Sequence, residues 1–344
     1  MVLYGLRGVG KTVLLTQLAL MAQRQGWVVV QAEARRGVSI REPIGESMHG
    51  LLLDIARPGV GARILKAVKT ALSFKASYDS TGVWHFGLDL SGVDGGGADT
   101  GSLETDLGRL LMDLAHVGQE RGTGVAVLID ESQDMSTEEL ATLCALVHAA
   151  NQRQEPLLVA LAGLPNVPRQ LSEAKSYAER LFTFHALGTL TTTQAREVLT
   201  GPASASGVSW SEKALCRVTD AAGGYPYFLQ EYGQDSWNAA QASPISDSDA
   251  RVGIAQGTLA LDTGFFRIRW DRATVAQRDY LRAMAVDGEG PSSAGWIAER
   301  LGKKASTLGP LRATLIAKGM IYAPQHGWVA FTVPAMAAFI DRQD

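Results

Sequence analysis

The stretch that decides the fold is Gly5-Leu6-Arg7-Gly8-Val9-Gly10-Lys11-Thr12, which has the form G-x-x-x-x-G-K-T. Residues 1–4 precede it as a short apolar run typical of a buried strand, and residues 12–24 follow with apolar side chains at helical spacing. A Gly-rich loop between a strand and a helix is the context in which this pattern binds phosphate. The sequence therefore predicts a phosphate-binding loop, and an ordinary turn with a surface lysine is the much weaker alternative.

The loop has a direct chemical logic. Glycines allow successive backbone N–H groups to turn inward around an anion, and the N-terminus of the following helix adds partial positive charge. We expect Lys11 to reach the β- and γ-phosphates of a nucleotide and the Thr12 hydroxyl to bind Mg²⁺. The residues predicted to bind the nucleotide are Gly5, Arg7, Gly8, Val9, Gly10, Lys11, Thr12 and Val13.

A second motif, Val125-Ala126-Val127-Leu128-Ile129-Asp130-Glu131, ends an apolar run with two carboxylates. Such a run is typical of a central parallel strand, and ligands bind at the C-terminal ends of these strands. We expect Asp130 to hold Mg²⁺ and Glu131 to be the catalytic base that deprotonates the attacking water. Alone, the pair could equally cap the next helix. With a phosphate loop upstream, the Walker B interpretation is favoured.

The rest of this region predicts further strands and helices. Apolar runs and helical spacing place strands at 27–32, 157–162 and 182–187, an exposed strand at 83–90, and helices at 43–55, 62–73, 103–120 and 140–152. Asn166, in the turn after the 157–162 strand, either senses the γ-phosphate or is a simple turn residue. Arg180 is either an arginine finger that reaches a neighbouring subunit's phosphate or the partner of a surface carboxylate such as Glu179.

From Thr191 onward the pattern changes to short helices. The first is capped by Thr191 and should be stopped by Pro202, and three more follow at 211–221, from 226 onward and at 246–261. Four short helices with short links predict a small helical lid. After it come helices at 273–285, 292–301 and 306–318 and a hairpin at 321–331, the pattern of a winged-helix domain.

Positive charge is concentrated in that last segment. Residues 265–344 contain 11 Lys and Arg against 7 Asp and Glu, in a chain whose net charge is −3. This distribution favours DNA binding by the winged helix, and the predicted contacts are Lys303, Lys304, Thr307 and Arg312. Because the excess is modest and many winged helices bind proteins, docking of a protein partner stays open.

Length and composition set the limits. A chain of 344 residues exceeds one typical core, so we expect domains at 1–188, 189–263 and 264–344. With 46% hydrophobic and 19% charged residues and no apolar run of membrane-spanning length, it is expected to be a cytoplasmic protein without membrane contact. Cys144 and Cys216 lack metal-ligand spacing, and we expect both to be reduced and buried.

Together these motifs resemble an AAA+ ATPase, most closely the origin-recognition-like and related STAND-type P-loop ATPases of prokaryotes. The resemblance spans essentially the whole chain, and the two Walker motifs are its specific part. It implies an α/β fold in which a P-loop parallel-sheet domain precedes a helical lid and a winged helix. It also implies ATP and Mg²⁺ as cofactors, Lys11 and Thr12 as phosphate and Mg²⁺ ligands, Asp130 as a Mg²⁺ ligand, Glu131 as catalytic base and Arg180 in the arginine-finger segment.

The sequence departs from this family in two places. A segment before the first strand usually helps to hold the adenine, and here the chain begins almost at the loop, so either the sequence is truncated or the base is held differently. The turn Gly223-Gly224-Tyr225-Pro226 holds no sensor arginine and resembles the corresponding turn of STAND switch ATPases, which places efficient turnover in doubt.

Two functions therefore remain. In the first, Glu131 activates water, the lid moves, and the winged helix changes its hold on double-stranded DNA. In the second, the protein is a nucleotide-gated protein-interaction switch with little turnover and no DNA binding. The sequence leaves open whether the other partner is a homo-oligomer or a different protein.

Overall fold

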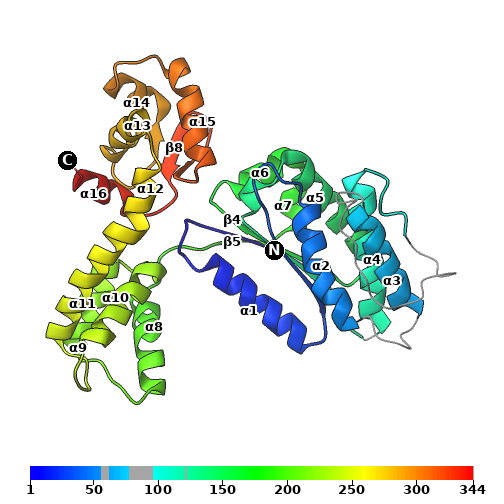
Figure 1. The fold of residues 1–344 in the computed structure, drawn as a ribbon, viewed down its shortest axis with the longest axis horizontal. Helices are drawn as coiled ribbons and strands as arrows, with labels where there is room; N and C mark the ends of the chain where they lie inside the picture. The colour runs from blue at the N-terminus through cyan, green and yellow to red at the C-terminus, as the bar shows by residue number, and fades with distance from the viewer. Residues whose placement is uncertain (56–61, 77–95, 121, 344) are drawn as a thin grey trace. The chain divides into compact units, whose positions relative to one another are not determined.

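The computed structural model describes residues 1–55, 62–76, 96–120 and 122–343 (Figure 1). It divides into two compact units. The first comprises Met1–Tyr4 and Lys11–Ala186, and the second comprises Gly5–Gly10 and Leu187–Asp344. The loop of the first motif thus groups with the second unit, while the strand before it and the helix after it belong to the first.

The first unit is built on a five-stranded parallel sheet in the order β2-β3-β4-β1-β5. Its strands are β1 (Val2–Tyr4), β2 (Val28–Glu33), β3 (Val125–Asp130), β4 (Leu157–Gly163) and β5 (Phe184–Ala186). In β3 the five apolar residues are buried and Asp130 is the first residue to reach solvent. The run of apolar residues therefore fixes both the strand and the place where its carboxylates emerge.

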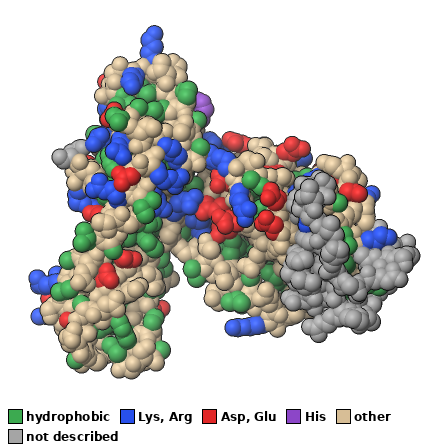
Figure 2. Space-filling model, viewed as in Figure 1, with side chains coloured by type: hydrophobic (Ala, Val, Ile, Leu, Met, Phe, Trp, Pro, Cys, Tyr) green, Lys and Arg blue, Asp and Glu red, His purple; other side chains and the backbone are tan. Residues whose placement is uncertain are grey.

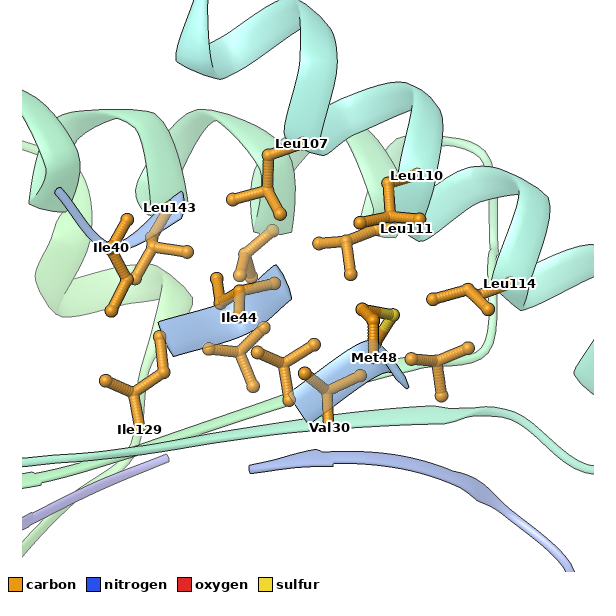
Figure 3. Packing of buried hydrophobic residues seen from close by; sticks show 14 of the residues in the cluster. Val30, Ile40, Ile44, Met48, Leu107, Leu110, Leu111, Leu114, Ile129 and Leu143 are labelled. Carbon is orange, nitrogen blue, oxygen red and sulfur yellow. The ribbon is translucent and has the colours of Figure 1, made fainter. Parts of the chain in front are cut away.

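Helices cover the sheet. They are α1 (Lys11–Arg24), α2 (Arg41–Ile55), α3 (Ala62–Ala76), α4 (Leu103–Glu120), α5 (Thr137–Gln152), α6 (Val167–Ala174) and α7 (Ala178–Leu181). Helix α1 packs against β2, β3 and β4. Figure 3 shows the main core, where Val30 and Ile129 of the strands meet Ile44 and Met48 of α2 and the leucines of α4.

Helix α4 illustrates why this sequence folds as it does. Leu107, Leu110, Leu111 and Leu114 recur at helical spacing, and each is at most 3% exposed. Full burial of one such side chain stabilises the fold by about 1.5–3 kcal/mol. This stripe, rather than helix propensity, therefore holds the helix against the sheet.

The second unit begins with the four predicted lid helices, α8 (Thr192–Ala205), α9 (Glu212–Ala222), α10 (Pro226–Ala239) and α11 (Asp247–Ala260). Thr191 caps α8 as expected, but the expectation that Pro202 stops this helix is wrong. Pro202 lies inside the last turns, and the chain leaves the helix only at Gly207, whose φ of 72° is left-handed. Val208 N–H then donates to Ala203 O at 2.9 Å, which closes the helix end.

Helix α11 does not end at a linker. It continues through a π-helical turn, η2 (Leu261–Phe266), into α12 (Arg267–Asp271). Phe266 stacks on Phe339 with ring centroids 5.2 Å apart. The boundary expected near 262–264 therefore lies within a continuous helical segment.

The remaining elements are α13 (Val275–Ala285), β6 (Ser292–Ser293), α14 (Ala294–Arg300), α15 (Gly309–Ala317), β7 (Ile321–Tyr322), β8 (Trp328–Phe331) and α16 (Met336–Asp341). The strands form an antiparallel sheet in the order β6-β8-β7, so the predicted hairpin is confirmed. Five elements, α6, α7, α12, β6 and α16, were not predicted from the sequence. The strand predicted at 83–90 lies outside the described residues. In the part of the chain that the structure describes, no helix is both long and apolar enough to cross a membrane.

The two cysteines differ. Cys144 is fully buried in α5, whereas Cys216 is exposed, so the expectation that both are buried is wrong for Cys216. Cys216 lies on the polar side of α9, within 3.7 Å of Arg196 and 3.6 Å of Glu212. Burial raises the pKa of the Cys144 thiol to about 11.

We expect a thiol reagent at pH 8 to modify one cysteine rapidly in the folded protein, because only Cys216 is accessible and the Cys144 thiol stays protonated. Both should react after unfolding in denaturant. Spectrophotometric thiol titration measures this, and Cys216→Ser is the control that should remove the fast phase. Two fast thiols in the folded protein would contradict the packing of α5.

Candidate nucleotide-binding site

Thr12 and Asp130 meet although 118 positions separate them in the chain. Thr12 stands in the first turn of α1, and Asp130 ends β3. Thr12 Oγ1 donates to Asp130 Oδ2 at 2.5 Å, and Glu131 N–H donates to Asp130 Oδ1 at 2.8 Å. A hydroxyl beside a carboxylate supplies the oxygen ligands that Mg²⁺ prefers, so these residues fit the ion. Lys11, the neighbouring predicted phosphate ligand, is only 8% exposed.

The loop glycines have separate structural reasons. Gly8 and Gly10 have φ of 85° and 91°, a left-handed conformation that side chains disfavour. A Cβ at Gly5 would lie 2.2 Å from Leu187 O, so packing excludes a side chain there. A Cβ at Gly8 would also lie 2.8 Å from the hydroxyl oxygen of Tyr225, the aromatic residue of the Gly-Gly-Tyr-Pro turn.

The other predicted loop residues are placed as follows. The Arg7 N–H donates to Thr332 O at 2.9 Å, so the chain's own carbonyl occupies this amide. Val9 is buried in the core of the second unit, and the Val13 side chain on α1 is 63% exposed. The Val13 side chain is therefore accessible to a ligand, whereas the Val9 side chain is not, and the Arg7 backbone N–H could bind a phosphate only if its bond to Thr332 opened.

Glu131 has a left-handed backbone, with φ of 50°, between β3 and a 3₁₀ turn at Ser132–Asp134. It makes no side-chain cap to that turn. The next helix, α5, is capped instead by Ser136, whose hydroxyl accepts from Glu139 N–H in a capping box. The alternative that Asp130 and Glu131 serve as a helix cap is therefore wrong.

Gln133 is the residue that the sequence analysis missed. Its Nε2 donates to Glu131 Oε2, and its Oε1 accepts from Leu164 N–H at 2.9 Å. Only 7% of Gln133 is exposed. A polar residue two places after the carboxylate was the available signal, but its burial could not be deduced from composition or spacing.

Asn166 and Arg180 take different positions. Asn166 precedes α6 and makes no side-chain cap, and its Oδ1 is buried without a hydrogen-bond partner. Arg180 lies exposed in α7. No ion pair between Arg180 and Glu179 occurs among the described residues, so the structure does not support that alternative for Arg180.

The predicted DNA contacts lie around the start of α15. Lys303, Lys304 and Thr307 are exposed, and Arg312 is half-buried. The Thr307 hydroxyl donates to Lys304 O at 2.7 Å. Lys318, which directly follows α15, is half-buried, and its Nζ donates to Arg272 O at 2.6 Å and to Gln277 Oε1 at 2.7 Å.

Two family models match the chain. Residues 1–160 match the AAA ATPase domain, and residues 263–340 match a model described as a domain of unknown function, DUF8462. The match over residues 1–160 confirms the predicted resemblance to an AAA+ P-loop ATPase and supports ATP binding. A comparison with curated protein sequences finds no match.

The chain is also similar to solved structures. The Walker-type ATPase paby2304 of Pyrococcus abyssi has 16% identity and a TM-score of 0.58, covering 99% of this chain and 90% of that one. Cdc6p of Pyrobaculum aerophilum has 16% identity and a TM-score of 0.44 over 99% and 86%. The Thermotoga maritima RuvB Holliday junction branch migration motor has 14% and 0.43 over 96% and 83%. The likeness to the Pyrococcus protein is one of fold.

We expect Lys11→Ala to weaken ATP binding by roughly 10- to 100-fold or more, because a charge-assisted hydrogen bond contributes about 1.5–3 kcal/mol. Isothermal titration calorimetry measures the affinity. Lys213→Ala, which removes an exposed lysine of α9, is the matched control and should bind ATP normally. Unchanged affinity in Lys11→Ala would remove the phosphate-loop assignment.

Proposed function

We propose that the protein hydrolyses ATP with Mg²⁺ and couples this reaction, through movement of its helical lid, to DNA binding by a C-terminal winged helix. The observation that carries the catalytic part is the hydrogen bond between Thr12 and Asp130, with Glu131 directly following. Two predicted metal ligands and a predicted base are thereby gathered at the C-terminal end of one parallel strand, the edge at which such sheets bind ligands.

Each residue has a distinct role in this proposal. Lys11 binds the β- and γ-phosphates, and the Thr12 hydroxyl and the Asp130 carboxylate hold Mg²⁺. When bound, the ion neutralises charge on the phosphate oxygens. Glu131 orients a water molecule toward the γ-phosphate and accepts its proton. Arg180, exposed on α7, is in this proposal the residue that a neighbouring subunit would present to the same phosphate.

Glu131→Gln should leave ATP binding intact and lower the hydrolysis rate by roughly 10²-fold or more, the usual scale for losing a general base. Glutamine keeps the shape of the side chain but cannot accept the proton. Phosphate release under saturating ATP measures the rate, and Glu138→Gln, an exposed carboxylate of α5, is the matched control. Equal rates in wild type and Glu131→Gln would show that Glu131 is not the base.

The DNA-binding part rests on the order of elements and on the pairing of charge. The order α13, β6, α14, α15, β7, β8, with an antiparallel three-stranded sheet, supports the proposal of a winged helix. The second family match begins near the proposed 264–344 domain. Figure 2 shows Lys and Arg side chains on the visible face of this segment, with fewer Asp and Glu.

Several arginines of this C-terminal segment are already paired with carboxylates. Arg278 lies 3.4 Å from Asp271, Arg282 lies 3.5 Å from Asp279, and Arg300 lies 2.5 Å from Asp287. Lys303 and Lys304 are exposed in the turn before α15, and within the described part of the chain no ion pair involves either of them. Their charge is therefore available for phosphate groups of DNA.

The double change Lys303→Ala/Lys304→Ala should weaken duplex binding without altering ATP binding. Loss of two phosphate contacts should flatten the slope of log affinity against log salt by about 2 units. Fluorescence anisotropy over a salt series measures the slope, with Lys213→Ala as control.

A wild type that binds no duplex at low salt, with or without ATP, would refute the DNA role. The nucleotide-gated protein-interaction switch would then be favoured. The exposed Trp296, whose ring lies 5.5 Å from that of the half-buried Trp328, marks the surface on which a protein partner would be sought.

A further inference from the structure

Gln133 links the predicted base to the neighbouring strand through both ends of its amide. One end, Nε2, donates to Glu131 Oε2, and the other, Oε1, accepts from Leu164 N–H at 2.9 Å. The Gln133 backbone carbonyl accepts from Gln170 Nε2 at 3.2 Å, which ties the same residue to α6. The side chain is 7% exposed, so water does not compete effectively for these bonds.

The direction of this amide is dictated by its partners. The oxygen and nitrogen of a glutamine are commonly assigned from the hydrogen-bond network. Here the backbone N–H of Leu164 is a donor and needs an acceptor, so only Oε1 can face it. The NH₂ group must then point toward the carboxylate of Glu131, which accepts. An amide is the neutral group that satisfies both neighbours.

The end of β4 leaves no room for another arrangement. Ser132 Oγ donates to Ala162 O at 2.8 Å, on one side of Gly163, while Gln133 takes Leu164 N–H on the other. A Cβ at Gly163 would lie 2.8 Å from both Gln133 Oε1 and Ser132 Oγ. Hydrogen bonds on both sides of Gly163 therefore connect the end of β4 to the turn after β3.

The backbone conformation of Glu131 is unfavourable and needs these hydrogen bonds to stabilise it. Its φ of 50° is a conformation that L-residues rarely adopt, and it persists only where the surroundings hold it. The 3₁₀ turn contributes one hold, because Asp134 N–H donates to Glu131 O at 2.9 Å. Gln133 restrains the Glu131 side chain through the hydrogen bond from Nε2 to Oε2.

We infer that Gln133 is a positioning residue for ATP hydrolysis: its amide fixes the direction of the Glu131 carboxylate by anchoring it to Leu164 at the end of β4. The inference rests on the proposed hydrolysis. It adds that the direction of the Glu131 carboxylate depends on the C-terminal end of β4, next to the turn that contains Asn166. A displacement of this end of β4 would therefore move the base. In this inference Gln133 acts through Glu131 and not on the nucleotide or the attacking water itself.

The decisive variant is Gln133→Glu. A glutamate of the same length still accepts from Leu164 N–H but can no longer donate to Glu131, and it places a second negative charge beside it. We expect kcat to fall at least roughly tenfold with KM for ATP changed by less than about twofold, since orientation of the base matters only in the chemical step. Gln23→Glu, which makes the same charge change at an exposed position of α1, should leave both constants unchanged.

A double-mutant cycle separates positioning from a structural role. In the Glu131→Gln background, Gln133→Glu should cause no further loss in single-turnover hydrolysis, because the group that Gln133 positions has already been removed. Losses that multiply in the double variant, or a KM that rises with kcat unchanged, would overturn the inference. A similar melting temperature for all variants checks that the fold is retained.

Crystal structures of wild type and Gln133→Glu with a non-hydrolysable ATP analogue decide the matter independently of turnover. The inference predicts that the Glu131 carboxylate turns away from its wild-type direction in the variant while Leu164 N–H stays bonded. A carboxylate in the same direction in both would overturn it. A wild type without ATPase activity would refute the proposed hydrolysis and leave the tie between Gln133 and Glu131 to this comparison.

Discussion

The hydrogen bond between Thr12 and Asp130 exists only because the sheet is parallel. β3 ends in Asp130, and α1, which begins one residue before Thr12, packs on β2, β3 and β4. In a parallel sheet all carboxyl ends lie at one edge, so residues that leave different strands are brought together without any local signal in the sequence. The buried residues of β3 and its register against β2 and β4 therefore determine where the carboxylates lie. The position of the site is set by the packing of the sheet, and the hydrogen bonds within the site form as a consequence.

The position of the carboxylates requires an unfavourable backbone conformation at Glu131, whose φ is 50°. A left-handed conformation costs an L-residue about 1–2 kcal/mol. Bonds within the turn offset it, including Asp134 N–H to Glu131 O at 2.9 Å and Ser132 Oγ to Ala162 O at 2.8 Å. Each hydrogen bond contributes about 0.5–1.5 kcal/mol net, so a few of them balance the strain. A buried polar cluster of this kind is costly when incomplete, which makes the turn a rigid support rather than a flexible loop.

The features that could be predicted from the sequence are those with a local physical cause. The five strands and the Walker motifs follow from apolar runs and from glycine and carboxylate spacing, and the helix cap at Thr191 follows from a side chain that bonds a nearby N–H group. The features that were not predicted depend on contacts between residues that lie far apart in the chain. β6 has two residues and exists because β8 pairs with it, and Cys216 is exposed because α9 turns that side to solvent. The partners of Gln133 lie on the turn after β3 and at the end of β4, and no spacing rule connects them.

The charge of the C-terminal segment is a second property that the sequence alone does not determine. The sequence counts 11 positive against 7 negative residues, but the count does not say which charges are available. Guanidinium groups within 4 Å of carboxylates present little net field to a partner, whereas Lys303 and Lys304 stand together in an exposed turn. The ammonium group of Lys318, just after α15, already donates hydrogen bonds to Arg272 O and Gln277 Oε1. Each pair of an arginine and a carboxylate cancels one positive and one negative charge, so the excess of positive charge stays the same while its distribution over the surface changes. The charges of Lys303 and Lys304 lie next to each other just before α15, and this local concentration cannot be deduced from the count.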